Sequence, residues 1–192
     1  AFEIGSSLVG SEMCIRDRLQ TLVHEKTGSN KRAFEIVQKY QEAFTGGYEN
    51  RYSAEESYRD ILKIEEALSA QCLTLDLLQN ETVCTDQEGI CHLDLKFYHC
   101  NQSIDLSSVI PIIENMGFYV ISEIPSEVRL PDGQHIWIQH FKLRSDGLVI
   151  DTKSFNQRKP LFEQSFLDIY ADKTENDLLN QLTLKQGLSG HD

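Results

Sequence analysis

Positive charge is scarce in this chain of 192 residues. Lysine and arginine together number 18 against 30 aspartates and glutamates, so the net charge is −12. Nucleic acids and anionic membrane surfaces are bound through basic patches, and we therefore expect neither as a partner. No apolar run is long enough to predict a membrane-spanning helix, and the first residues lack the pattern of a secretory signal. These absences favour a folded, cytoplasmic protein.

The usual local signatures of catalysis and cofactor binding are also missing. The sequence contains no Gly-x-Gly-x-x-Gly after a predicted strand, no Gly-Lys-Ser/Thr phosphate loop and no Gly-x-Ser-x-Gly elbow. His135 and His140 flank Trp137 on a predicted strand, but their odd separation puts them on opposite faces. We therefore predict no catalytic, no cofactor-binding and no metal-binding residue in this chain.

Cysteine is present but not in a metal-binding spacing. No two cysteines are spaced Cys-x-x-Cys, and the odd count favours reduced thiols in a cytoplasmic protein. A zinc site of Cys91, His92, His99 and Cys100 is unfavourable, because neighbouring strand residues point to opposite faces. The five cysteines are Cys14, Cys72, Cys84, Cys91 and Cys100.

Residues 1–18 are set aside as non-native or disordered. The stretch Leu8–Arg18, LVGSEMCIRDR, resembles a translated transposon-type sequencing adapter.

Residues 19–70 predict a helical segment with two helices. The first follows Ser29 and ends at Gly46-Gly47, with an apolar side of Ala33, Ile36, Val37, Tyr40 and Phe44. The second starts at the capping box Ser53–Glu56. Its predicted apolar side is Tyr58, Ile61, Leu62 and Leu68. Its acidic residues are Glu55, Glu56, Asp60, Glu65 and Glu66. We interpret them as structural rather than as a metal site, because Glu55 and Glu56 lie in the first turn and Glu65 and Glu66 fit a solvated face.

Residues 71–171 predict an α+β domain. Strands are expected at Leu73–Leu78 and Cys91–His99, separated by a polar loop at 80–89. A helix capped by Ser107 or Ser108 follows, with Pro111 in its first turn and Gly117 at its left-handed end. A hairpin with strands Phe118–Ile124 and Ile136–Leu143 comes next, and its turn is Pro-Asp-Gly at 131–133. The last helix is predicted at Pro160–Tyr170.

The predicted order is strand, strand, helix, strand, strand, helix. It matches a permuted ferredoxin-like domain, an antiparallel four-stranded sheet with both helices on one face. Pro125 demotes its strand to a sheet edge. Trp137, Phe141 and Leu143 share a strand face and are expected in the core.

The stretch DLSSVIPIIENMGFYVISEIPSEVRLPDGQHIWIQHFKL resembles the large bacterial NAD-specific glutamate dehydrogenases. The pattern from Ala43-Phe44 to Ile64-Glu65 and the segment from Thr174 to Ser189 extend the resemblance over residues 19–192. The resemblance implies a non-catalytic, ACT-like regulatory domain at 71–171, with residues 172–192 leading into a helical region before a catalytic domain that this chain does not contain.

The family deaminates glutamate oxidatively to 2-oxoglutarate and ammonia with NAD, in amino acid catabolism, as a homo-oligomer. The resemblance therefore implies the rest of the enzyme and its other subunits as partners. The ACT-like domain also suggests an amino-acid effector, although the loop Cys100–Asp105 lacks the glycine usual at such sites. The alternative is a free-standing ACT-like module that binds an amino acid or a partner protein.

Overall fold

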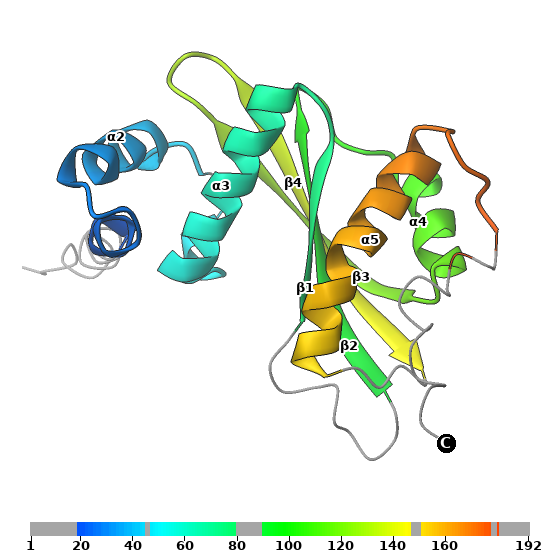
Figure 1. Ribbon diagram of the computed structural model, residues 1–192. Helices are drawn as coiled ribbons and strands as arrows, with labels where there is room; N and C mark the ends of the chain where they lie inside the picture. Colours follow the sequence, from blue (N-terminus) through cyan, green and yellow to red (C-terminus); the bar gives the residue numbers. More distant parts are fainter. Residues whose placement is uncertain (1–18, 45–46, 80–89, 147–150, 178–179, 181–192) are drawn as a thin grey trace, which may run out of the picture. The chain divides into compact units, whose positions relative to one another are not determined.

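The computed structural model describes residues 19–44, 47–79, 90–146, 151–177 and 180 (Figure 1). Residues 19–27 are helical. The elements that follow are α2 (Asn30–Tyr40), η1 (Tyr48–Asn50), α3 (Ala54–Ala70), β1 (Thr74–Gln79), β2 (Ile90–Cys100), α4 (Leu106–Asn115), β3 (Tyr119–Arg129), β4 (His135–Asp146) and α5 (Thr152–Tyr170).

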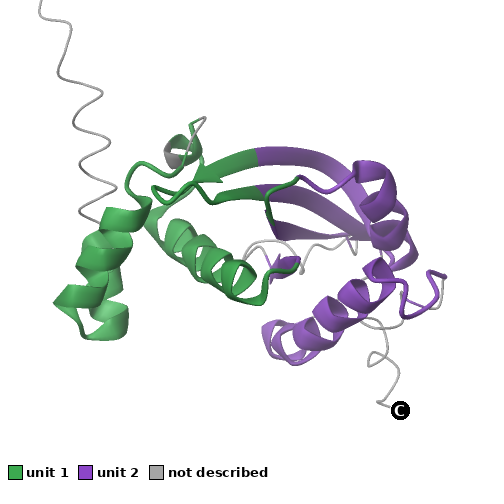
Figure 2. Ribbon diagram, turned by 90° about the horizontal axis from the view of Figure 1, so that it is seen from above, with its two compact units in different colours: residues 1–72, 100–102, 126–137 green, residues 73–99, 103–125, 138–192 purple. Residues whose placement is uncertain are grey.

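The chain divides into two compact units (Figure 2). Unit 1 comprises residues 1–72, 100–102 and 126–137, and unit 2 comprises residues 73–99, 103–125 and 138–192. The sequence-based boundaries at 18, 70 and 171 stay a prediction, and residues 1–18 lie outside the described part of the chain.

The four strands form one sheet in the order β1-β2-β4-β3. β1 and β2 are antiparallel, with Thr74 opposite Tyr98 and Gln79 opposite Leu93. This is the strand order of the permuted ferredoxin-like arrangement, so the predicted α+β fold is confirmed. β3 carries Pro125 and lies at an edge, as its sequence predicted.

The core of unit 2 lies between one face of the sheet and the two helices α4 and α5. Alternate residues of the strands point into it, because side chains alternate between the faces of a strand. The Phe97 ring meets the Phe141 ring edge-on at 5.4 Å, and Phe118 meets Phe162 in the same way at 5.7 Å. The core residues from the strands are Leu75, Leu77, Cys91, Leu93, Leu95, Phe97, Phe141 and Leu143, and those from the helices are Val109, Ile112, Ile113, Phe155, Phe162, Phe166 and Ile169.

The other face of β2 departs from the expectation for a half-solvated strand. Lys96 and Tyr98 are only 1% and 0% exposed. A lysine buried this completely is rare unless it is paired, and its cross-strand neighbour in the ladder is Asp76. The side chains of β2 alternate between the two faces of the sheet, but Lys96 and Tyr98 on the second face are buried rather than exposed to solvent.

Helix α4 corrects two of the sequence expectations. Its N-cap is Asp105, and Ser107 and Ser108 lie inside the first turn. Pro111 lies in the second turn, where it removes a helical hydrogen bond instead of replacing an orphan donor. The helix ends as predicted, with Gly117 at φ 90°. Its N–H donates to Glu114 and the next N–H to Ile113, which forms a Schellman cap.

Several other elements are longer than the sequence indicated. α5 begins at Thr152 rather than Pro160, because Asp151 caps it by accepting a hydrogen bond from the Ser154 N–H at 3.0 Å. Pro160 is therefore inside the helix. β3 continues through Pro125 to Arg129, where Ile124 was the predicted end.

In unit 1 the capping box at Ser53 and Glu56 is confirmed. α2 ends at Tyr40, before the predicted Gly46-Gly47 stop, and Gly47 instead precedes η1 at φ 75°. Leu62 was predicted to face the core but is 45% exposed, whereas Asp60, to which the sequence assigned no position, is fully buried.

Candidate functional site

The loop before α4 is the first candidate, because an ACT-type effector would approach its backbone. The side-chain amide of Gln139 on β4 forms two hydrogen bonds with the backbone of this loop. Its Oε1 accepts from the Ile104 N–H at 2.6 Å, and its Nε2 donates to the Ile104 C=O at 3.1 Å. Both backbone groups of Ile104 are therefore already satisfied and buried, and neither is free to bind an effector.

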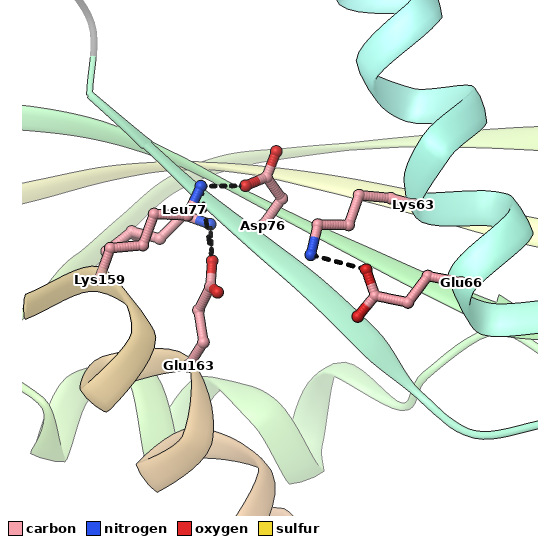
Figure 3. A network of polar contacts seen from close by, with 6 residues as sticks. All are labelled: Lys63, Glu66, Asp76, Leu77, Lys159 and Glu163. Carbon is pink, nitrogen blue, oxygen red and sulfur yellow. Dashed lines mark hydrogen bonds and ion pairs between the residues drawn. The ribbon is translucent and has the colours of Figure 1, made fainter. Parts of the chain in front are cut away.

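A second polar cluster closes the outer edge of β1 (Figure 3). Glu163 on α5 accepts the Leu77 N–H at 2.9 Å, so a side-chain carboxylate takes the place of a neighbouring strand's carbonyl. Lys159, one turn earlier, bonds to Asp76 and lies 3.7 Å from Glu163. Exposed strand edges invite pairing with other chains. This cluster therefore blocks pairing at Leu77 and holds α5 against β1.

Asp76 is the most buried acid of this cluster. Its side chain is 2% exposed, and its Oδ2 has no hydrogen bond among the described residues. A buried carboxylate is costly unless it is paired, and Asp76 has two cationic neighbours: Lys159, to which it is bonded, and Lys96, which lies opposite it in the ladder. The arrangement is that of a structural ion pair.

His140 and Asp94 form a similar pair on β4 and β2. The His140 Nε2 lies 2.7 Å from Asp94 Oδ1, and the histidine side chain is 9% exposed. The sequence placed His135 and His140 on opposite faces of their strand, and in the structure His135 lies 3.5 Å from Glu127, whereas His140 pairs with Asp94. A His–Asp pair is not by itself a catalytic site, because a hydrolytic triad also requires a nucleophile.

Unit 1 has its own buried polar contacts, which the sequence did not indicate. The Tyr48 hydroxyl donates to the fully buried Asp60, and the Tyr40 hydroxyl donates to Glu65 at 2.6 Å. Burial and the neighbouring carboxylate raise the pKa of both tyrosines well above their usual range. The available sequence signal was the recurrence of aromatic residues at every fourth position, Tyr40, Phe44, Tyr48 and Tyr52, whose neighbouring rings are in contact in the structure.

The remaining charged residues of α3 support the solvated interpretation. Glu65 and Glu66 are exposed and pair with Lys39 and Lys63 at 2.7 and 3.0 Å (Figure 3 shows the second pair). Among the described residues no group of three or more histidines, cysteines, aspartates or glutamates could hold a metal ion.

The cysteines depart from the expectation at one position. Cys72 and Cys100 are free thiols. Cys91 is disulfide-bonded, so the prediction of reduced thiols is wrong there. Its side chain is fully buried in the core, and its place as an inward-facing residue near the start of β2 gives no sequence signal for such a bond.

The N-termini of α3, α4 and α5 each carry an acidic side chain. A pyrophosphate is normally held at an open helix N-terminus that follows a parallel strand. Here the α3 start is closed by the Glu56 carboxylate and the α5 start by Asp151, whose pKa is lowered by its bonds to Ser154. α4 also begins at an aspartate, Asp105. These negative charges oppose a phosphate. No helix of the described chain is both long enough and apolar enough to cross a membrane.

Comparison with known proteins assigns both parts of the chain. Residues 74–155 match the family model described as glutamate dehydrogenase, ACT3 domain. Residues 23–67 match the model described as glutamate dehydrogenase, helical motif 2. The sheet with its two helices is therefore an ACT domain, preceded by the helical motif of the same enzymes.

The curated relatives agree on one kind of protein. The NAD-specific glutamate dehydrogenase of Pseudomonas aeruginosa is 27% identical over 178 residues, which is 92% of this chain and 10% of the relative. The enzymes with the same description from Halomonas elongata and Mycobacterium tuberculosis are 29% and 26% identical over 153 residues, 80% and 78% of this chain and 9% of each relative. The chain is therefore similar to a region of the large NAD-specific glutamate dehydrogenases that contains helical motif 2 and the ACT3 domain, and it spans about a tenth of the length of these relatives.

Proposed function

We propose that this chain is a non-catalytic, structural or regulatory region of an NAD-dependent glutamate dehydrogenase. The parent reaction would be oxidative deamination of glutamate to 2-oxoglutarate and ammonia. The observation that carries the proposal is the ordered match of helical motif 2 at residues 23–67 and the ACT3 domain at residues 74–155. NAD would be bound by other parts of the enzyme, and the chain's partners would be those parts and other subunits of a cytoplasmic homo-oligomer.

The polar groups support a scaffold role over an effector site. In an effector site some buried polar groups wait for the ligand, whereas in a scaffold they are paired within the protein. The Ile104 backbone is paired with Gln139, and the Leu77 N–H with Glu163. The first pair of bonds fixes the loop before α4, and the second fixes the position of α5. Both therefore support a structural role for this region.

Segment replacement in a full-length relative tests the proposal. Residues 19–192 replace the aligned segment of the Pseudomonas aeruginosa enzyme, and a second variant lacks that segment. We expect the chimera to form the native oligomer and to reduce NAD with glutamate, because the region supplies the fold and not the active site. We expect the deletion to lose the oligomer, as measured by light scattering. Normal assembly and turnover of the deletion would refute a structural role.

An amino-acid binding assay tests the alternative module. The isolated chain is titrated calorimetrically with a panel of amino acids, and the variant Gln139→Leu, which frees the Ile104 backbone groups, is titrated in parallel. If the chain is a scaffold, we expect no saturable heat when the original chain is titrated with any of the amino acids. Saturable binding that Gln139→Leu changes would favour the effector-binding alternative.

A further inference from the structure

Two free thiols stand at corresponding positions of β1 and β2. In the antiparallel ladder Thr74 lies opposite Tyr98. Because the two strands run in opposite directions, the positions two residues beyond this pair are Cys72 and Cys100. Cys100 is the last residue of β2, and Cys72 lies just before β1. Both cysteines belong to unit 1, and both are free.

This placement suits a disulfide. Residues directly opposite in an antiparallel pair have Cα atoms about 4.5–5.5 Å apart. A disulfide requires a Cα separation of about 4.4–6.8 Å with the two side chains on one face. Cys72 and Cys100 are an even number of residues from Thr74 and Tyr98, so their side chains belong to the same face of the ladder.

The electrostatics of the thiols agree with this placement. Burial raises the pKa of the Cys100 thiol, and the charge of Cys72 raises it further. Such an effect is expected between neighbouring thiols. The thiols also differ in access: Cys72 is exposed, whereas Cys100 is partly buried. Cys72 is therefore the thiol that an oxidant in solution meets first.

We propose that Cys72 and Cys100 are a redox-sensitive pair that forms a reversible disulfide by exchange with a low-molecular-weight disulfide such as oxidised glutathione. In the first step the Cys72 thiolate attacks one sulfur of oxidised glutathione. The glutathione disulfide bond breaks, a mixed disulfide forms on Cys72, and one glutathione thiolate leaves. In the second step Cys100 gives up its proton and attacks the Cys72 sulfur, which releases the second glutathione. The two cysteines lose two electrons, and oxidised glutathione gains them.

The bridge would tie the end of α3 to the start of the loop before α4. It would close a chain segment that contains all of β1 and β2, and it would restrict the unfolded state accordingly. Because Cys72 and Cys100 lie just beyond the last residue pair of the ladder and not at a ligand site, this inference does not depend on the proposed function.

Peptide mapping of the 192-residue chain tests the proposal. The protein is incubated with oxidised glutathione, alkylated and digested with trypsin and Glu-C without reduction. Cleavage after Glu66, Glu81, Lys96 and Glu114 leaves Cys72 alone in residues 67–81 and Cys100 alone in residues 97–114. We expect these two peptides joined by a disulfide that dithiothreitol breaks. The variant Cys100→Ser should stop at glutathionylated Cys72.

Thermal denaturation provides an independent readout. Oxidation should raise Tm by roughly 5–10 °C in the original chain, and this shift should be absent in Cys100→Ser and in Cys72→Ser. Cys72 is exposed, so Cys72→Ser stays informative even if Cys100→Ser fails to fold. The proposal is overturned if the original chain stops at glutathionylated Cys72, or if Cys100 is joined to a different cysteine.

Discussion

The ion pair between Lys159 and Asp76 makes a sharp prediction about stability. Lys159→Met removes the ammonium group but keeps most of the apolar stem of the side chain. Asp76, which is 2% exposed in the original chain, then loses its ion pair with Lys159, and its Oδ2 already lacks a hydrogen bond among the described residues. Breaking a buried ion pair by removing one partner costs about 3–5 kcal/mol. Because Lys159 is 25% exposed, solvent screening reduces our expectation to about 2–3 kcal/mol.

Chemical denaturation of the 192-residue chain measures this loss of free energy of unfolding. In a thermal melt the same variant should show a drop in Tm of roughly 4–10 °C. The matched control is Lys153→Met, which removes an exposed lysine from the same helix and should change the free energy of unfolding by less than about 0.5 kcal/mol.

The double variant Asp76→Asn with Lys159→Met isolates the interaction. If the pair acts as described, the loss caused by Lys159→Met is smaller in the Asp76→Asn background, with a coupling energy of about 1–3 kcal/mol. Equal losses in both backgrounds, or a Lys159→Met no less stable than Lys153→Met, would refute the assignment of Lys159 as the partner that stabilises buried Asp76.

Three further predictions concern single contacts. Gln139→Leu leaves the N–H and C=O of Ile104 buried and unpaired, and should lower the free energy of unfolding by about 2–4 kcal/mol in denaturant titrations; an unchanged midpoint would contradict the described loop. Tyr48→Phe removes the hydroxyl that donates to fully buried Asp60 and should cost about 1–3 kcal/mol, whereas a neutral result would show that other groups satisfy this acid. Asp151→Ala should lower Tm at neutral pH. Because the pKa of Asp151 is lowered in the folded chain, its contribution is present above about pH 4 and is lost as pH falls through the folded value, so the two Tm values should converge in acid.

The sequence was informative where the period of apolar residues and the turn chemistry agree. The alternation of Leu93, Leu95 and Phe97 identified β2, and Pro125 identified an edge strand. Gly117 correctly marked the end of α4, because its positive φ suits only a residue without a side chain. The order of these elements was enough to predict the topology of the sheet.

Sequence reasoning failed where tertiary contacts override local preference. Proline was expected only near helix starts, but Pro111 and Pro160 lie inside α4 and α5. The apolar faces of these helices are buried in the core, and that packing outweighs the lost backbone bond. The burial of Asp60 was not predicted, because the sequence does not show that Tyr48 provides it with a buried hydrogen-bond donor.

Local sequence patterns also could not predict the polar contacts of the ACT domain. Gln139 lies 35 residues from Ile104, and Glu163 lies 86 residues from Leu77. Single glutamine and glutamate residues at such distances carry no spacing signal. The sequence did indicate correctly that residues 100–105 lack the glycine of an effector loop, and the structure adds that Gln139 satisfies the Ile104 backbone in that loop.

The central claim is that this region of the dehydrogenase carries no catalytic machinery, and turnover by the isolated chain tests it most directly. Purified protein is incubated with glutamate and NAD, and the appearance of NADH is followed by absorbance. The full-length enzyme from Pseudomonas aeruginosa serves as the positive control under the same conditions. The account predicts no glutamate-dependent NADH formation above that of a sample without protein. Formation of NADH in proportion to the concentration of the chain would contradict it.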